Sequence, residues 1–231
     1  EIGLKRGREI SELPMPTATK RDSAYALECL REAKKLYAPL VESYEGMIKG
    51  GGFDRGRFTF YFFARREGVL RGCTGFSALP PATRNRAVIV GRNYDWVYSD
   101  LKWCELRHVH SEGVTPFISY THHWAGHPDC LNENGLCVII SSLPRREPAE
   151  PGLQWNLLVD TIAETCSSVE EAERILTSVY HLRSMAYLIT DSNGRAAVVE
   201  AEPGKQAAGV ALRNCGFGQV GVDGGGADPD Q

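Results

Sequence analysis

The sequence lacks the features that mark membrane, secreted and nucleic-acid-binding proteins. It has no run of about 18 apolar residues, so we expect no membrane-spanning helix and no membrane partner. Its start, EIGLKRGREISELP, has no apolar signal segment, which favours a cytoplasmic protein. It has no long run of charge of one sign, and its formal net charge is -3. We therefore expect no nucleic-acid partner, and small-molecule substrates stay open.

The cysteines form no CxxC pair and are odd in number, which indicates reduced thiols rather than a disulfide framework. They are Cys29, Cys73, Cys104, Cys130, Cys137, Cys166 and Cys215. Zinc-type spacing is also absent, although His122, His123 and His127 form an HHxxxH group near Cys130. We favour histidines that line a pocket over a metal site there, and we expect no metal and no cofactor.

The first part of the chain has a helical pattern. Apolar residues recur at spacings of three and four over residues 22–44, which predicts an amphipathic helix that Pro39 kinks or splits. Residues 1–20 are polar and are expected to form an extended lead-in. The aromatic segment 57–70 fits a helix or a strand, and periodicity does not decide between them.

From Cys73 onward the pattern changes to strands with a helical pair between them. Ser168 and Glu171 have the spacing of a helix capping box. The expected elements are a hairpin over 73–96, two strands within 105–125, a strand over 136–140, two helices within 153–178 and a second hairpin over 185–202. This order predicts the α+β class, with helices layered on an antiparallel-rich sheet.

The stretch around Cys73 contains the residues for nucleophilic catalysis. If the Gly72–Cys73 bond were cut, Cys73 would carry a free α-amine beside its thiol, and that amine could take and return a proton. A nearby arginine favours the thiolate form of a cysteine. Arg92 and Asp95 lie three apart at the end of the neighbouring strand, as candidates to favour the thiolate and to orient the amine.

Four separated motifs, GCTGF, GRNYDW, LNENGLCV and LITDSNGRAAVVEAE, together resemble the N-terminal nucleophile (Ntn) hydrolases of the penicillin acyltransferase (acyl-coenzyme A:isopenicillin N acyltransferase-like) family. More distantly, the chain is similar to choloylglycine hydrolases and penicillin V acylases. The resemblance covers roughly residues 25–202. It implies an αββα sandwich and a precursor that cuts itself before its nucleophile, here at Gly72–Cys73.

The resemblance also implies a division of the chain and a set of site residues. Residues 1–72 become a helical prosegment removed by self-cleavage, and residues 73–231 become the Ntn-hydrolase domain, which we expect to be incomplete at its C-terminus. The expected catalytic residues are Cys73, Arg92, Asp95 and Asn214. Ser142 is the expected oxyanion stabiliser by spacing, and Asn132 matches a family position that we interpret mainly as a structural turn.

The function implied is that of an amidase or acyltransferase. Cys73 would attack an amide or thioester carbonyl, and water or an amine would take the acyl group from the enzyme. The substrate would be a small amide or an acyl-CoA, and the oligomeric state is left open. An alternative is an unprocessed, non-catalytic relative that binds an amphipathic acyl ligand. A third reading, a papain-like protease, needs a histidine beside Cys73.

Overall fold

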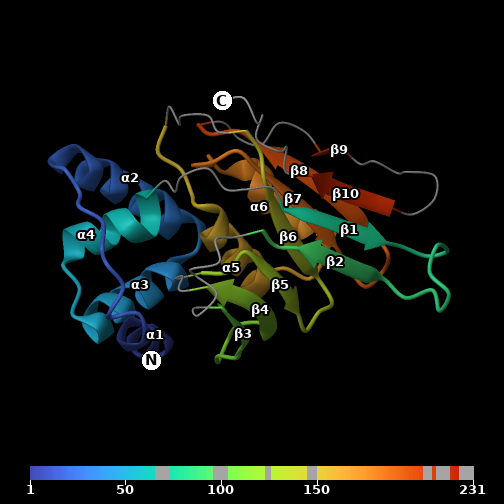
Figure 1. The fold of residues 1–231 in the computed structure, drawn as a ribbon, viewed down its shortest axis with the longest axis horizontal. Helices are drawn as coiled ribbons and strands as arrows, with labels where there is room; N and C mark the ends of the chain where they lie inside the picture. The colour runs from blue at the N-terminus through green and yellow to red at the C-terminus, as the bar shows by residue number, and fades with distance from the viewer. Residues whose placement is uncertain are drawn as a thin grey trace.

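The computed structural model describes residues 1–65, 73–95, 104–122, 126–144, 150–204, 210–211 and 219–223 (Figure 1). Its helices are α1 (Ile2–Glu9), α2 (Lys20–Leu36), α3 (Ala38–Gly51), α4 (Arg55–Thr59), the π-helix η1 (Phe60–Ala64), α5 (Trp155–Thr165) and α6 (Val169–Ser178). Its strands are β1 (Thr74–Ala78), β2 (Ile89–Asn93), β3 (Cys104–Val109), β4 (Phe117–His122), β5 (Asp129–Asn132), β6 (Cys137–Ser142), β7 (Met185–Thr190), β8 (Ala196–Ala201), β9 (Val210–Ala211) and β10 (Gln219–Asp223).

The strands form two antiparallel sheets that lie against each other. The larger sheet has the order β3-β4-β5-β6-β7-β8-β9, and the smaller has the order β10-β1-β2. Between them, Ile139 packs with Leu188 and Val198 in a separate apolar cluster. The sheets approach closely at Gly75, where an added Cβ would lie 2.2 Å from Ile139 Cδ1. A side chain at Gly75 would therefore require the Ile139 side chain to move.

Helices α5 and α6 cover the other face of the larger sheet. Helix α5 packs on β5 and β6, and α6 packs on β7 and β8. Strand β7 is buried along its whole length because both of its faces are covered. Helix α6 begins at Ser168, whose side chain accepts from the Glu171 backbone N–H. The Glu171 carboxylate bonds to Ser167 instead, so only half of the predicted capping box forms.

The strand and helix predictions after Cys73 are confirmed. Both hairpins form, as β1–β2 and β7–β8, and α5, α6 and β4 lie within the expected ranges, whereas β3 begins one residue before its range. The helix predicted over 22–44 divides into α2 and α3 at Tyr37. Pro39 then falls in the first turn of α3, where its missing N–H has no intrahelical partner to lose. The segment that fitted helix or strand is helical, as α4 and η1.

The prediction of an extended lead-in over residues 1–20 is wrong, because α1 forms there and packs closely on α3. Glycines allow this approach. A Cβ at Gly7 would lie 2.2 Å from Met47 O, and a Cβ at Gly50 would lie 2.1 Å from Leu4 O. Glycines are poor helix formers in isolation, so the polar, glycine-containing sequence does not indicate the helix that its packing stabilises.

The N-terminal helices and the rest of the chain share one hydrophobic core. Side chains of α2, α3 and η1 belong to the same buried cluster as those of α5 and the larger sheet. Polar contacts cross the same boundary. Tyr37 Oη donates to Glu164 Oε2 at 2.7 Å, and Gln154 Nε2 donates to Arg65 O at 3.0 Å. Residues 1–65 are therefore part of the folded body rather than an appendage.

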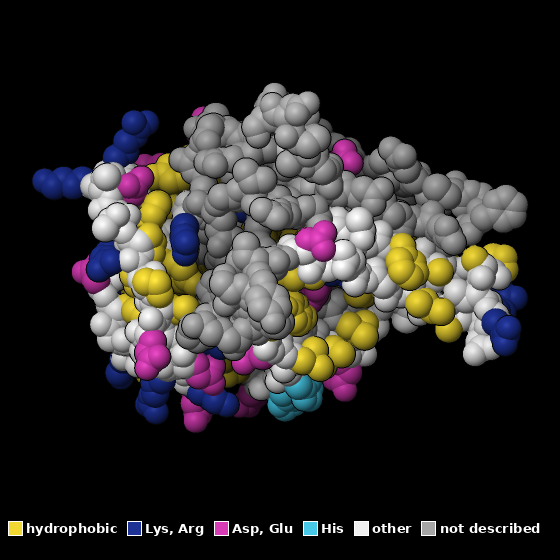
Figure 2. All heavy atoms as spheres, in the orientation of Figure 1, with side chains coloured by type: hydrophobic (Ala, Val, Ile, Leu, Met, Phe, Trp, Pro, Cys, Tyr) yellow, Lys and Arg dark blue, Asp and Glu magenta, His cyan; other side chains and the backbone are white. Residues whose placement is uncertain are grey.

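Charged side chains of both signs are interspersed over the helical end of the molecule on the face shown in Figure 2. That face has no extended patch of one sign over these helices. None of the helices in the described part of the chain combines the length and the apolar character needed to cross a bilayer.

Glu164, at the boundary between α5 and the N-terminal helices, makes stability depend on pH. Burial, with a contribution from Asp160, raises the pKa of Glu164 from 4.5 to about 7. The folded state therefore holds this proton more tightly than the unfolded state, and the resulting stabilisation, complete below the unfolded pKa, is lost as pH rises through the folded pKa. Between about pH 5 and about pH 8, Glu164→Gln should lose less of its free energy of unfolding than the wild type does, as measured by urea denaturation.

The exposed Glu133 provides the matched control for this measurement. Glu133→Gln removes the same charge from a solvated position, so its stability should follow the wild-type pH dependence. Identical pH profiles for Glu164→Gln and the wild type would contradict the assignment of this pH dependence to Glu164.

Candidate active site

Cys73 lies immediately before β1 and is 4% exposed. Its carbonyl oxygen accepts a hydrogen bond from Ser141 Oγ at 2.7 Å, which ties the residue to the end of β6. Gly72, the other half of the predicted cleavage junction, lies outside the described residues. Cys73 is thus held at the edge where the two sheets meet.

Arg92 contacts the thiol of Cys73. The antiparallel register of β1 and β2 pairs Arg92 with Gly75, close to the start of β1. Arg92 Nη2 donates to Cys73 Sγ at 3.8 Å, and the guanidinium carbon lies 4.5 Å from the centroid of the Tyr94 ring. A guanidinium at this distance can stabilise negative charge that develops on the sulfur during a reaction. The geometry therefore brings two of the predicted catalytic residues together.

The carboxylate that pairs with Arg92 is Asp129, which the sequence analysis did not single out. Arg92 Nη1 lies 2.5 Å from Asp129 Oδ2, and the two side chains are 9% and 16% exposed. Asp129 Oδ1 in turn accepts from the backbone N–H of Tyr120 at 3.2 Å. Buried charges need such partners, since an isolated one is costly. Asp129 therefore fixes the direction in which Arg92 points.

Asp95 is placed differently from Asp129. It is exposed, and its Oδ1 accepts from Asn93 Nδ2 at 2.8 Å. No contact between Asp95 and Cys73 occurs among the described residues. Its predicted role in orienting the amine of Cys73 stays a prediction.

The serine that reaches Cys73 is Ser141 rather than Ser142. Successive strand residues point to opposite faces of a sheet. Ser142 on β6 pairs with Met185 on β7, and Met185 belongs to the hydrophobic core between the larger sheet and the helices. Ser141 pairs with Ala186, which faces the smaller sheet. Among the other predicted oxyanion groups, Asn214 lies outside the described residues.

Asn132 is buried and connects β5 to α5. Its Nδ2 donates to Ala163 O at 3.1 Å and to Cys166 O at 2.8 Å, and its Oδ1 accepts from Leu136 N at 3.0 Å. All three contacts are structural, and none of them involves Cys73. The side chain therefore secures the turn between β5 and β6 to the end of α5.

Removing these contacts should be costly. Asn132→Ala leaves two carbonyls and one N–H with fewer partners in a buried site, so we expect a loss of about 3 kcal/mol in the free energy of unfolding. Asn134 is exposed and reaches Cys166 O only at 3.5 Å, so Asn134→Ala should change stability by no more than about 0.5 kcal/mol. Urea unfolding of both variants tests this, and equal losses would contradict it.

A cavity of about 520 Å³ lies beside the Arg92–Asp129 pair. Both of these residues line it, together with Tyr120. Its apolar walls come from both sheets and include Val88, Val90, Leu106, Ile118, Leu131 and Ile139. Small-molecule sites have this size and this combination of apolar walls with a few polar groups.

Tyr120 connects this cavity to Cys104. Its hydroxyl donates to Cys104 Sγ at 2.6 Å, and its ring packs edge-on against Tyr94 with 5.4 Å between centroids. Burial, together with the hydrogen bond to Cys104, raises the pKa of Tyr120 to about 12. Tyr120 therefore stays protonated at neutral pH and acts as a hydrogen-bond donor.

The histidines whose side chains are described have partners away from Cys73. His108 and His110 lie near each other, with 6.4 Å between ring centroids. His127 pairs with Asp160, and His181 bonds to Leu176 O. These positions do not favour the papain-like reading.

The HHxxxH group falls partly outside the described residues, namely at His123 and at the side chain of His122. Within the described residues, no group of three or more His, Cys, Asp or Glu side chains is arranged to hold a metal ion.

Two solved structures share the fold of this chain. One is the Caenorhabditis elegans N-acylethanolamine-hydrolyzing acid amidase ortholog, 12% identical, with a TM-score of 0.54 over 65% of this chain and 69% of that one. The other is a mutant of the conjugated bile acid hydrolase from Clostridium perfringens, 16% identical, with a TM-score of 0.51 over 64% of this chain and 52% of that one. The chain therefore has an Ntn-hydrolase fold, and the predicted α+β sandwich is confirmed.

Residues 82–219 match the family described as acyl-coenzyme A:6-aminopenicillanic acid acyl-transferase, and the chain belongs to that family. Penicillin V acylase from Agrobacterium tumefaciens is 20% identical, with a TM-score of 0.43 over 66% of this chain and 50% of that one. The chain thus spans about half the length of this acylase and of the bile acid hydrolase. No curated protein sequence matches it.

Proposed function

We propose that this chain is a self-processing cysteine Ntn hydrolase that cleaves or transfers an acyl group through an acyl-enzyme on Cys73. The observation that carries the proposal is the guanidinium of Arg92 at 3.8 Å from Cys73 Sγ, beside an apolar cavity, in a chain of an acyltransferase family. By their names, the two structures that share the fold are an N-acylethanolamine-hydrolyzing acid amidase and a conjugated bile acid hydrolase. The substrate proposed here is accordingly a small linear amide or an acyl thioester.

Processing precedes catalysis in this proposal. Cys73 Sγ attacks the carbonyl carbon of Gly72, the peptide C–N bond breaks, and hydrolysis of the resulting thioester leaves Cys73 with a free α-amine and a free thiol. The N-terminal helices share a hydrophobic core with α5 and the larger sheet, so the cleaved segment would stay bound until it is actively displaced. In this proposal residues 1–72 stay bound as a subunit after cleavage, rather than leaving as the removed prosegment that the family resemblance implies.

The catalytic cycle then uses the new α-amine as its base. The amine takes the thiol proton, and the sulfur, with Arg92 beside it, attacks the acyl carbon of the substrate. The tetrahedral intermediate collapses with the proton going to the leaving amine or thiol, which gives an acyl thioester on Cys73. Water or an amine then attacks this thioester, returns a proton to the α-amine and regenerates the thiol.

The cavity beside Arg92 supplies the acyl-binding surface. Its side walls, such as Ile118 on β4 and Leu131 on β5, are apolar and partly exposed. An acyl chain placed against them would bury apolar surface from both partners, at about 25 cal/mol per Å². Asp129 holds Arg92 in place at the polar end of this cavity. Asp95, Ser142 and Asn214 keep the roles that the family resemblance implies for them.

Turnover of two matched acyl donors tests the function. The purified chain is incubated with hexanoyl p-nitroanilide, an amide, and with hexanoyl-CoA, a thioester, and product release is followed by absorbance. We expect saturable release from at least one donor and a mass increase of one hexanoyl group on the enzyme. Saturable binding of both donors without release would instead support the unprocessed, non-catalytic alternative.

A further inference from the structure

A second cavity, of about 430 Å³, lies between the N-terminal helices and the larger sheet. Its walls include Leu40 and Met47 from α3, Phe62 from η1 and Phe117 from β4. Phe117 and Ile118 are neighbours on a strand and point to opposite faces, and Ile118 lines the cavity beside Arg92. The second cavity is therefore separated from the Cys73 site by the sheet. Its volume is within the range of small-molecule sites.

One pole of this cavity is formed by His127 and Asp160. His127 is 7% exposed, and its Nδ1 lies 2.7 Å from Asp160 Oδ1. In the neutral imidazole tautomer that carries its proton on Nδ1, Nε2 is a hydrogen-bond acceptor. This Nε2 is buried and has no hydrogen-bond partner among the described residues. A buried polar atom without a partner is destabilising, and a ligand that supplies the missing partner would remove that cost.

The same pole carries a second carboxylate. Asp160 and Glu164 are one turn apart on α5 and both line the cavity. Burial, followed by the charge of Asp160, raises the pKa of Glu164 to about 7. The direction of this shift means that the ionised form of Glu164 is not fully compensated by positive charge. A cation at this pole would compensate it.

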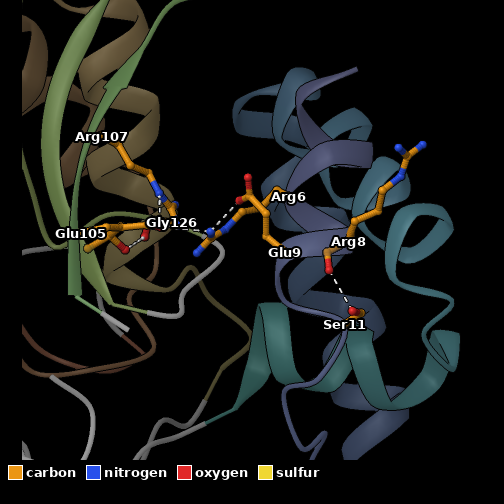
Figure 3. A network of polar contacts seen from close by, with 8 residues as sticks. Arg6, Arg8, Glu9, Ser11, Glu105, Arg107 and Gly126 are labelled. Atoms are coloured by element: carbon orange, nitrogen blue, oxygen red, sulfur yellow. Dashed lines mark hydrogen bonds and ion pairs between the residues drawn. The ribbon is translucent and has the colours of Figure 1, made fainter. Parts of the chain in front are cut away.

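The arginines that line the cavity are engaged with other carboxylates. Figure 3 shows Arg6 between Glu9, on its own helix, and Glu105 on β3, at 2.9 and 3.1 Å. Arg107 also bonds to Glu105. These pairs form a polar network between α1 and β3. Lys5, His108 and His110 also line the cavity, and the carboxylates of Asp160 and Glu164 lie at the His127 pole.

We infer that this cavity is a binding site for a small aliphatic primary amine. The ammonium group donates to His127 Nε2 and lies beside Asp160 and Glu164, and the alkyl chain lies along Met47 and Phe117. An ammonium has three donors and a full charge, which suits a pole with two carboxylates and an imidazole nitrogen. The walls of the cavity come from segments before Cys73 and from segments after it in the sequence. The bound amine therefore ties the N-terminal helices to the sheet. The site is distinct from that of the proposed function and does not depend on it.

Three six-carbon probes with different head groups test this inference. Hexylamine, hexan-1-ol and hexanoate are titrated into the full chain labelled with carbon-13 at its methionine methyl groups. The sequence has three methionines, Met15, Met47 and Met185; Met47 lines the cavity, and Met185 lies in the core outside it. We expect hexylamine to shift Met47 saturably and to bind at least about tenfold more tightly than hexanoate, while Met185 stays unchanged.

Two further measurements identify the pole that binds the amine. Hexylamine should bind more tightly at about pH 8 than at about pH 5.5, because Glu164 is then ionised. Glu164→Gln should weaken hexylamine binding about tenfold and leave hexan-1-ol unchanged, whereas the exposed-site control Glu133→Gln should change neither. If Glu164→Gln loses the native Met185 signal, Asp160→Asn provides the same comparison. An unshifted Met47, hexanoate binding equal to that of hexylamine, or equal behaviour of the Gln variants would overturn the inference.

Discussion

Cys73→Ala is expected to remain a single uncut chain and to lose acyl transfer by at least about 10⁴-fold, since alanine has no nucleophile to attack Gly72 or a substrate. The wild type should instead give fragments of residues 1–72 and 73–231 that purify together. Intact-mass analysis under denaturing conditions separates these outcomes. The fragments should co-elute under native conditions because the N-terminal helices share the core with the larger sheet.

Cys29→Ala is the matched control for this experiment. Cys29 is a fully buried thiol of α2, far from Cys73 in the chain, with its pKa raised to about 11 chiefly by burial. Its replacement should cost some stability through the small cavity left behind, but it should leave processing intact. If Cys73→Ala were still cut between the same residues, Cys73 would not be the agent of processing.

Arg92→Gln is expected to slow acyl-enzyme formation by about 10²–10³-fold, because it removes the cation next to Cys73 Sγ. It also leaves the partly buried Asp129 without its charged partner, which we expect to lower the free energy of unfolding by about 2 kcal/mol. Arg92→Lys keeps the positive charge but cannot contact Asp129 and Cys73 with two separate nitrogens, as Nη1 and Nη2 of Arg92 do. Its acylation rate should therefore fall between those of Arg92→Gln and the wild type. Single-turnover acylation with hexanoyl-CoA measures the rates, and urea unfolding measures the stability.

The same single-turnover acylation assay distinguishes the roles of the carboxylates of Asp129 and Asp95. Asp129→Asn keeps the shape of the side chain but weakens its hold on Arg92, and it should slow acylation about tenfold or more. Asp95→Asn tests the role implied by the family resemblance. A slow step in Asp95→Asn that is restored by raising the pH would support orientation of the amine by Asp95. Wild-type rates in both Arg92→Gln and Asp129→Asn would contradict the electrostatic account.

The parts of the fold that could be predicted from the sequence are those fixed by local patterns. The two hairpins follow from turn residues between apolar runs, and α5 and α6 follow from helical periodicity and the Ser168 cap. Helix α1 could not be predicted in this way. Its stability comes from the close approach of Gly3 and Gly7 to α3, a contact between segments about forty residues apart that composition does not reveal.

In the candidate site, too, the contact set by local sequence could be predicted, and the contact set by long-range packing could not. Arg92 lies near Cys73 because the two belong to one hairpin, whose register follows from its own turn. Asp129 comes from β5, so its pairing with Arg92 depends on how the two sheets stack. Ser142 stays the predicted oxyanion group, but a shift of one residue along a strand moves a side chain to the other face. Ser141 therefore reaches Cys73, whereas the family spacing indicates Ser142.

The central claim, that Cys73 is the acyl-accepting nucleophile of a processed chain, is tested most directly by locating the acyl group. The wild type is mixed with hexanoyl-CoA, quenched in acid within a single turnover, digested and analysed by tandem mass spectrometry. We predict a peptide that begins at Cys73, with a free α-amine and one hexanoyl group on its sulfur. A hexanoyl group on any other residue, or a Cys73 still joined to Gly72 in acylated protein, would contradict the account.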